Sequence, residues 1–429
     1  MAQIRNRGWS VTFAGLGINL ALGILYTWSI FKLAIQESIT LGDGRFNWDI
    51  ASLNDPYAVC CLVFAFAMIP AGRLQDKFSP RFTAVIGGVL TGLGLIIISQ
   101  STSLFGWIMG FGVLAGMGIG FAYASATPPA IKWFPAAKTG MIAGIVVAGF
   151  GLASVYIAPL SNYLINRVGL SSSMMIFGVA FLILVCLLSL FLVNPPEGYV
   201  PELEKASSAT GVKPASKTRD FKPLEMMKTG SFIRLWLMYF VGAGAGLFII
   251  GGVAALAKQS MGQMAWLVVA LLAIGNAGGR VVAGILSDKI GRNQTLFLML
   301  VFQSLVIFSL LFIDKNVAFL VVLAATLIGF NYGTNLSLFP SMTKDYFGLK
   351  SFGSNYGLVF SAWGAGGFIF PRMAQMLVAR TGSYNTAYII TAGLLLVSAL
   401  LAITIKAPST VPETEKILVT TDSKPEFAG

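Results

Sequence analysis

The sequence predicts an all-α membrane protein with twelve transmembrane helices in two pseudo-symmetric six-helix bundles. Three observations support this prediction: the composition, the number of long apolar segments and an internal repeat. Of the 429 residues, 56% are hydrophobic and only 11% are charged. Such a balance cannot cover a water-exposed surface with polar side chains, so we expect much of the surface to face lipid.

Twelve apolar segments are long enough to cross a bilayer, because a hydrocarbon core takes about 20 apolar residues per helix. Short polar or Gly/Pro-containing breaks separate them. We expect spans at 9–33, 51–72, 82–101, 104–127, 139–166, 172–193, 231–256, 263–287, 294–313, 317–340, 351–379 and 385–406. The first segment is too long for a signal-peptide core and is followed by no small-residue cleavage site, so we interpret it as a retained helix.

The breaks and the charges divide the chain into four parts. We predict an N-terminal bundle over 1–193, a cytoplasmic linker over 194–230, a C-terminal bundle over 231–406 and a cytoplasmic tail over 407–429. With both termini in the cytoplasm, cytoplasmic loops and tails hold 21 of the 29 Lys and Arg residues, as the positive-inside rule favours. The excess of cations therefore follows topology and does not indicate nucleic acid as a partner.

These features predict a multi-pass cell-membrane protein, suited to a bacterial inner membrane and functional as a monomer in the lipid bilayer. Cys60, Cys61 and Cys186 lie in apolar segments without metal-ligand spacing. We expect neither a metal site nor an organic cofactor.

The internal repeat predicts two related halves. After the second helix the chain reads Gly72-Arg-Leu-Gln-Asp76-Lys-Phe-Ser-Pro-Arg81, and after the eighth it reads Gly284-Ile-Leu-Ser-Asp288-Lys-Ile-Gly-Arg292. Glycine, leucine, aspartate and lysine recur in the same order, and an arginine follows in each. Helices five and eleven repeat three glycines at identical spacing, at positions 140, 144 and 151 and at positions 353, 357 and 364. Helices four and ten repeat Ile-Gly-Phe-x-Tyr, ending at Tyr123 and Tyr332.

At this point the sequence resembles the major facilitator superfamily, whose signature loop joins helices two and three with a glycine, an aspartate and basic residues. The resemblance implies that the loop aspartates pair with basic residues and helix ends near the cytoplasmic surface, and so stabilise one of two alternating states. The residues that match this gating role are Asp76, Arg81, Asp288 and Arg292.

Arg280 is the clearest case of a charge inside a predicted span. Arg280 lies too deep in the span for its side chain to reach the membrane surface. A charge within the bilayer costs roughly 3 kcal/mol on insertion scales. Asn276 lies four residues earlier, on the same helical face. A guanidinium can bind a carboxylate through two parallel hydrogen bonds, so we expect an anionic ligand. The alternative is a structural role, in which Arg280 bonds to helix-end carbonyls or pairs within a cytoplasmic gate. Met68 occupies the equivalent position in the first half, so the cation has no symmetric partner and matches a single carboxylate.

Aromatic residues complete the candidate binding site. Four phenols occur where the first, fourth, tenth and eleventh helices could face a central cavity, and each could bond to a carboxylate or hydroxyl; they are Tyr26, Tyr123, Tyr332 and Tyr356. Phe360 and Trp363, one turn apart, could form an apolar wall for an alkyl group.

Four stretches resemble the oxalate:formate antiporters and the related monocarboxylate transporters. They are Gly23-Ile-Leu-Tyr-Thr-Trp-Ser, Lys132-Trp-Phe-Pro, Asn276-Ala-Gly-Gly-Arg280 with the loop that follows it, and Asn355-Tyr-Gly357. The resemblance implies a secondary active transporter that works by alternating access, in which Arg280 binds the substrate carboxylate. Trp363 stands where the oxalate carrier has a second cation, which favours a small monocarboxylate of the lactate or pyruvate kind over a dicarboxylate.

The coupling ion is less well marked. Asn276 stands where animal monocarboxylate carriers have an aspartate, and the chain contains no histidine. The candidates for carrying a proton are Asp55, Asp49 and Lys32. The family resemblance favours proton-coupled symport, whereas the permanent charge of Arg280 also suits an organic anion exchanger of the oxalate:formate type.

Other function classes match the sequence less well. An enzyme would need paired carboxylates, an activated nucleophile or metal ligands in the cavity, and the sequence shows no such constellation. A multidrug exporter would more usually carry a buried acid for cationic drugs, opposite in sign to Arg280. A nutrient sensor that does not transport often has a long signalling tail, whereas the predicted tail after Lys406 is short.

Overall fold

The computed structural model describes residues 6–49, 52–135, 138–196, 198–199, 220–314 and 316–408. Within these ranges every regular element is a helix, which confirms the all-α prediction. The predicted linker and tail fall largely outside the described residues, at 200–219 and 409–429.

The helices of the first half precede residue 190 and those of the second half follow residue 220. The first half comprises α1 (Gly8–Leu22), η1 (Gly23–Thr27), α2 (Trp28–Leu41), α3 (Asp55–Lys77), α4 (Pro80–Ser99), α5 (Leu104–Trp107), η3 (Ile108–Ala115), α6 (Gly116–Lys132) and α7 (Thr139–Ser189). The second comprises α9 (Pro223–Met227), α10 (Gly230–Met261), η5 (Gly262–Met264), α11 (Ala265–Ile290), α12 (Arg292–Ser309), α13 (Ala318–Phe347), α14 (Phe352–Thr381) and α15 (Asn385–Thr404).

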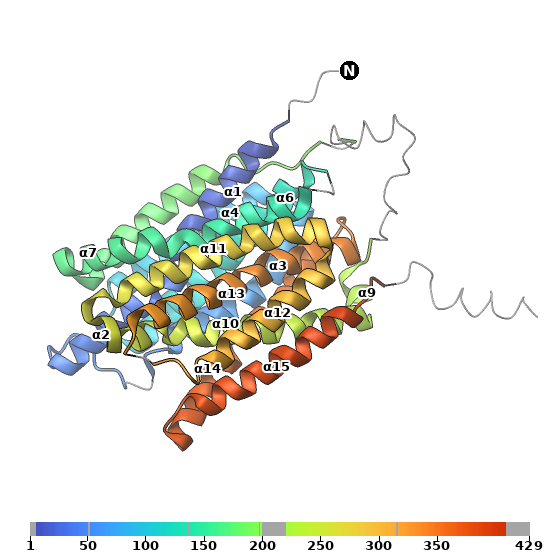
Figure 1. The fold of residues 1–429 in the computed structure, drawn as a ribbon. Coiled ribbons are helices and arrows are strands. Elements are labelled where there is room, and N and C mark those ends of the chain that lie inside the picture. Colours follow the sequence, from blue (N-terminus) through green and yellow to red (C-terminus); the bar gives the residue numbers. More distant parts are fainter. Residues whose placement is uncertain are drawn as a thin grey trace, which may run out of the picture.

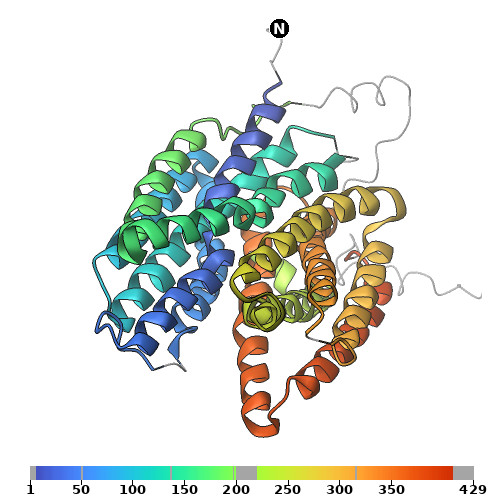
Figure 2. The same ribbon diagram turned by 60° about the vertical axis from the view of Figure 1, so that its left-hand side comes forward.

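These elements account for the twelve predicted spans. Over the described residues, nine helical stretches are long and apolar enough to cross a membrane, and the longest, Gly140–Ser189, contains the predicted fifth and sixth helices. Those two helices meet at Gly169, where φ is 81° and the direction of the chain changes. Helices α12 and α14 supply the ninth and eleventh spans. Figures 1 and 2 show the blue-to-green and yellow-to-red halves packed side by side.

Several helices continue past the apolar segment that predicted them. Helix α2 ends at Leu41 and α13 at Phe347, eight and seven residues beyond the predicted ends at 33 and 340. Backbone hydrogen bonding continues into the polar residues, and each helix ends only at a glycine with positive φ, Gly42 at 63° and Gly348 at 81°. Hydropathy alone does not reveal these stops, because a glycine's ability to adopt positive φ is a backbone property.

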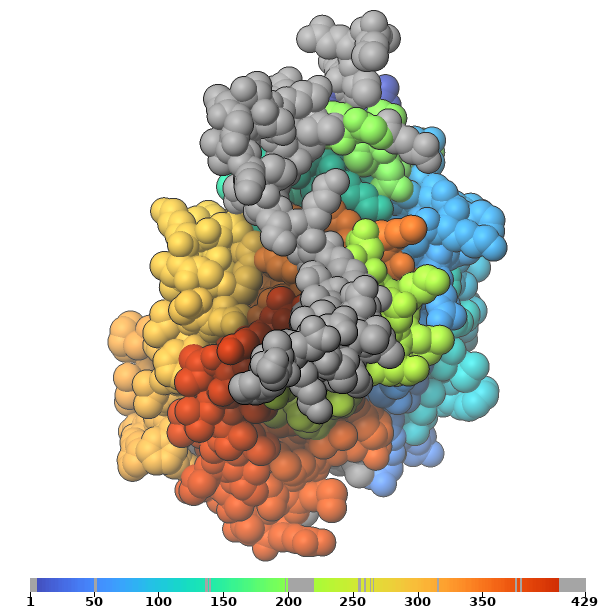
Figure 3. All heavy atoms as spheres, turned by 90° about the vertical axis from the view of Figure 1, so that its right-hand side faces the viewer, coloured from blue at the N-terminus to red at the C-terminus, as the bar shows by residue number. Residues whose placement is uncertain are grey.

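The two ends of the bundle differ in which segments they expose. We call the end that carries the first residue of α1 and the last of α15 the terminal end, and the opposite end the far end (Figure 1). At the terminal end Ser231 donates to the carbonyl of Lys406, and Trp133 donates to that of Val193. Figure 3 looks onto this end, where the yellow-green residues after 220 lie against orange residues near 350.

The glycines of the internal repeat lie where the two halves cross. Helix α3 packs on α14, and α7 packs on α11. A methyl group added at Gly140 would meet the Gly284 carbonyl at 2.7 Å, and one added at Gly353 would meet the Gly72 carbonyl at 2.9 Å. The repeated glycines therefore let the backbones of opposite halves approach closely at the terminal end, as small residues do between membrane helices.

Candidate functional site

Arg280 lies at the contact between the two halves. Helix α11 ends at Ile290, three residues beyond the predicted end, so the arginine lies nearly three turns inside the helix. Its side chain is completely buried. A methyl group added at Gly151 of α7 would meet the Arg280 Nε at 3.3 Å, so this glycine leaves room for the guanidinium beside the opposite half.

The guanidinium is bonded only to neutral acceptors. Its Nε donates to Oδ1 of Asn276 over 2.9 Å, and Nη1 donates to the carbonyl oxygen of Val147 in α7. Nη2 has no partner, nor does the side-chain amide nitrogen of Asn276. Across the described residues, none of the ion pairs involves Arg280. An unneutralised cation with an unused donor is therefore buried between the halves, and it is suited to an anion.

All four predicted tyrosines lie close enough to Arg280 for an electrostatic interaction with its positive charge. Tyr26 and Tyr332 share a hydrogen bond of 2.5 Å across the two halves, and the indole of Trp363 donates to the Tyr332 oxygen over 2.7 Å. The hydroxyls of Tyr123 and Tyr356 are buried without a hydrogen bond of normal geometry. The structure thus brings together polar groups from η1, α6, α13 and α14.

Aromatic rings surround these polar groups. Phe360 and Trp363 are stacked with ring centroids 5.0 Å apart, and Phe360 also lies 5.5 Å from Tyr123. Phe64 and Phe150 close the same cluster from the first half, each packing on Tyr123 at about 5.5 Å. These rings form an apolar cluster around the hydroxyls of Tyr123 and Tyr332.

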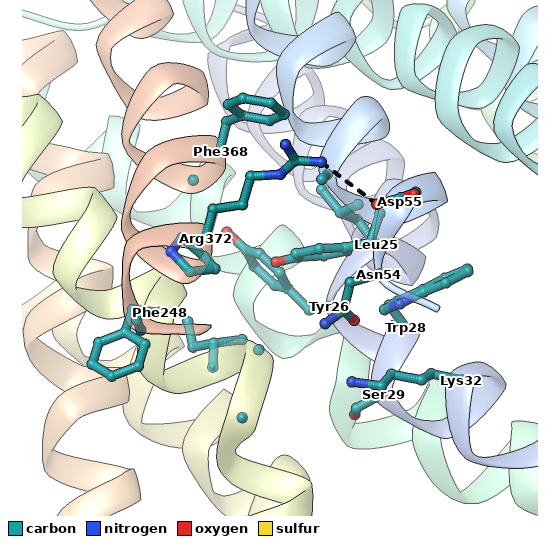
Figure 4. Close-up of a pocket in the computed structure, with 18 of the residues that line it drawn as sticks. Leu25, Tyr26, Trp28, Ser29, Lys32, Asn54, Asp55, Phe248, Phe368 and Arg372 are labelled. Atoms are coloured by element: carbon teal, nitrogen blue, oxygen red, sulfur yellow. Dashed lines mark ion pairs between the residues drawn. The ribbon is translucent and has the colours of Figure 1, made fainter. Parts of the chain in front are cut away.

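A cavity of about 360 Å³ lies between the halves toward the far end. Figure 4 shows part of its lining: Tyr26, Lys32 and Asp55 from the first half, and Phe248 and Arg372 from the second. Tyr26 belongs both to this cavity and to a void of about 10 Å³ beside Asn276. The cavity therefore reaches the tyrosine but stops short of Arg280.

Two of the three proton-coupling candidates line this cavity. Asp55, the first residue of α3, faces Arg372 of α14 at 3.7 Å. Lys32 lies nine residues before the end of α2, because that helix extends to Leu41 and does not end near residue 33. Asp49 is exposed in the segment before α3 and is not part of the cavity lining.

At the terminal end the first loop aspartate forms hydrogen bonds between the two halves. Asp76 of α3 accepts from the backbone N–H of Ser354 at 3.1 Å and from its hydroxyl at 3.3 Å. Ser354 lies in the first turn of α14, where unpaired N–H groups favour an anion. Lys132 adds a favourable charge interaction with Asp76. This carboxylate therefore joins the first half to the second.

The second loop aspartate makes the corresponding contact with the halves exchanged: its carboxylate belongs to the second half and accepts from a backbone N–H of the first. Asp288 of α11 accepts from the backbone N–H of Met141, near the start of α7, at 3.2 Å. Arg292 donates to Asp288 and, over 2.9 Å, to Asp345. Arg81, by contrast, is exposed, and no ion pair among the described residues includes it. Each aspartate thus joins the two halves at the terminal end, Asp288 together with Arg292, whereas Arg81 makes no such contact among the described residues.

Sequence reasoning missed several residues of this region. Arg372 could have been recognised as a candidate, because it is a charged residue inside the predicted span 351–379. Tyr239 of α10 is completely buried and stacks on Phe339 at 4.1 Å, near the hydroxyls of Tyr123 and Tyr356. Nothing in its sequence context distinguishes it from a core residue.

Comparisons with known proteins agree with this architecture. A sequence profile of the Major Facilitator Superfamily matches residues 8–371 and 235–425. The oxalate:formate antiporter of Oxalobacter formigenes is 26% identical over 396 residues, which cover 90% of this chain and 88% of the relative. Monocarboxylate transporter 13 of Bos taurus is 24% identical over 416 residues, which cover 95% and 92%.

A solved structure of similar fold is that of the proton:xylose symporter XylE. Its TM-score is 0.71 at 16% identity, covering 95% of this chain and 97% of that one. At such identity the likeness concerns the fold. The profile, which spans the described bundle, places the chain in a family: it belongs to the major facilitator superfamily.

Proposed function

We propose that this transporter carries small monocarboxylate anions of the lactate or pyruvate kind, with Arg280 binding the carboxylate. The observation that carries the proposal is a fully buried guanidinium between the halves with no carboxylate partner among the described residues and one unused nitrogen, Nη2. Because an unpaired charge in the bilayer is costly, such residues mark substrate paths.

The surrounding groups match a carboxylate with a short apolar part. A carboxylate oxygen could accept from Nη2 of Arg280 and from the free amide nitrogen of Asn276. The carboxylate would replace the Val147 carbonyl oxygen, which accepts the hydrogen bond from Nη1 in this structure. Phe360 and Trp363 offer the apolar wall, and Trp363 leaves no second cation for a dicarboxylate.

Alternating access supplies the mechanism. In this structure the aspartate contacts join the halves at the terminal end while the cavity lies at the far end, which corresponds to one of the two alternating states. We place the terminal end in the cytoplasm of a bacterial inner membrane, as the Lys and Arg distribution favours. The protein would work as a monomer, and the far-end cavity would then face outward.

Proton-coupled symport is the mode that we propose first. The bovine relative is named a monocarboxylate transporter, and Asp55 in the cavity wall offers a titratable carboxylate. Exchange is the second candidate, because one relative is named an oxalate:formate antiporter. An empty site with a permanent cation is charged and a loaded site is neutral, which favours crossing when loaded.

Uptake of labelled lactate into proteoliposomes tests the proposal. We expect parent uptake to be stimulated by an inward proton gradient, and Arg280→Gln to abolish it, whereas Arg234→Gln, at an exposed arginine of α10, leaves it unchanged. Uptake that requires preloaded anion instead of a gradient would favour exchange. Equal uptake by parent and Arg280→Gln would refute the role of Arg280.

A further inference from the structure

The cavity at the far end carries an unbalanced positive charge. Its charged lining, within the described residues, consists of the cations Lys32 and Arg372 and the carboxylate of Asp55. Two cations against one acid leave a net charge of one in a pocket with low-dielectric walls, and such a pocket concentrates anions.

Arg372 makes weak contacts in the described part of the chain. Its guanidinium carbon lies 4.7 Å from the centroid of the Phe368 ring, a cation–π contact worth about 0.5–1 kcal/mol at an exposed site. Its guanidinium reaches Asp55 at 3.7 Å, with 56% of the arginine side chain and 34% of the aspartate side chain exposed (Figure 4). A pair this long and this wet contributes little, about 0–1 kcal/mol. A substrate carboxylate, which can form two charge-assisted hydrogen bonds with the guanidinium, can therefore compete with Asp55 for it.

Lys32 has no partner in the described part of the chain. Figure 4 shows it beside Ser29 on α2, in the cavity wall formed by the first half. No ion pair or hydrogen bond that the structure describes involves its ammonium group. The side chain is only partly exposed, so this cation lacks both a counter-charge and full hydration.

A barrier separates these cations from Arg280. Tyr26 lies at the boundary of the cavity, and its hydroxyl is bonded to Tyr332 of the opposite half. Tyr26 belongs to η1, a short 3₁₀ segment between α1 and α2, and such a segment within a longer helix often marks a hinge. An anion arriving from the far end therefore meets Lys32 and Arg372 before Tyr26 can move aside.

We propose that this cavity is a second, peripheral anion site, in which the positive charges of Lys32 and Arg372 hold the transported anion before it passes Tyr26 to Arg280. The ligand class, a small monocarboxylate, rests on the proposed function. Asp55 competes with the ligand for Arg372 and so keeps the peripheral site weak. A weak site releases its anion inward instead of trapping it.

Binding to protein whose central site is disabled tests this inference. The background carries Arg280→Gln, Cys186→Ala to remove the half-buried native thiol, and Ser29→Cys to place a thiol in the cavity wall. The apparent Kd for lactate is read from protection of this thiol against a charged reagent. Size-exclusion profiles and unfolding temperatures show that each variant is folded.

The expected effects have opposite signs. We expect lactate to protect the thiol, Lys32→Gln and Arg372→Gln each to weaken protection about fivefold, and Asp55→Asn to strengthen it about fivefold, as loss of one charge at contact distance in a wet site predicts. Arg380→Gln is the control, because Arg380 lies on α14 like Arg372 but does not line this cavity. It should leave protection of the thiol unchanged. Higher ionic strength should weaken protection.

The outcomes separate this inference from the proposed function. Protection in protein with intact Arg280 but none in the Arg280→Gln background would overturn the peripheral site and leave the central site standing. Protection that ignores the charges of Lys32, Arg372 and Asp55 would also overturn it. Protection with the expected signs, in a protein whose lactate uptake does not depend on Arg280, would support the peripheral site while refuting the proposed function.

Discussion

Replacing Gly72 by alanine should push the transporter out of the state seen here. The added methyl carbon would lie 2.3 Å from the carbonyl oxygen of Gly353 and 2.4 Å from its carbonyl carbon. Both obstacles are backbone atoms, so α3 and α14 must separate by roughly 1 Å, and overpacking of this kind costs about 1–3 kcal/mol. The cost applies only while the terminal end is closed, and a bias of about 1–3 kcal/mol between two states changes their ratio about 5–150-fold.

Thiol accessibility measures that ratio. In protein carrying Cys186→Ala and Ser29→Cys, the far-end cavity exposes the thiol to a membrane-impermeant reagent added at that side. We expect Gly72→Ala to slow its modification at least about fivefold, by the bias worked out above. Gly278→Ala is the matched control, because a methyl group there meets nothing within 4 Å. Equal modification rates in the two variants would refute the close contact between Gly72 and Gly353 as a determinant of the closed terminal end.

Three further predictions concern the central site and the terminal end. Asn276→Asp places a carboxylate beside Arg280, so lactate uptake should fall at neutral pH and recover as acidification protonates the new aspartate. Tyr332→Phe removes the acceptor of the Trp363 indole and should cost about 1–3 kcal/mol, read as a lower unfolding temperature. Asp288→Asn weakens charge-assisted hydrogen bonds worth about 1.5–3 kcal/mol, and should slow modification of the far-end thiol.

Each of these predictions has a control and a result that would contradict it. Uptake by each variant is expressed relative to the parent at the same pH, because a proton-coupled parent also gains uptake on acidification. Asn276→Leu keeps the size without the charge, and a relative uptake that recovers on acidification in this variant as well would exclude the new carboxylate as the cause. Tyr388→Phe changes a buried tyrosine whose hydroxyl has no hydrogen bond among the described residues, and an equal loss of stability there would count against the Trp363 contact. Asp314→Asn, at the far end, is the control for Asp288→Asn and should leave the rate of thiol modification unchanged. An unchanged rate in Asp288→Asn as well would show that Asp288 does not help to close the terminal end.

Much of the fold was predictable because it depends on hydropathy and repetition. The twelve spans follow from apolar length, and the repeated glycines follow from duplication. Gly169 was not predictable as a direct connection between two helices, since the sequence suggested a short break there, and the positive φ that turns the chain leaves no hydropathy signal. The extension of α2 to Leu41 could not be predicted from hydropathy, because residues 34–41 mix polar and apolar side chains.

The site was predictable where a residue was unusual for its surroundings. An arginine in an apolar segment attracts notice, and so Arg280 and its neighbour Asn276 were found. The partner of that arginine, the Val147 carbonyl, is a backbone atom that every residue possesses, and no pattern could have marked it. The position of Tyr26 in the sequence marks it as a candidate. Its bond to Tyr332, 306 residues away, depends on how the two halves pack.

The absence of a carboxylate beside Arg280 in the described residues has an electrical consequence. When access switches from one side to the other, the membrane field shifts relative to the fixed guanidinium, and one elementary charge is worth about 2.3 kcal/mol per 100 mV. An empty carrier therefore senses the membrane voltage as it reorients. A carrier loaded with one monocarboxylate is neutral at this site, so the voltage acts on its empty return step and leaves the loaded step almost untouched.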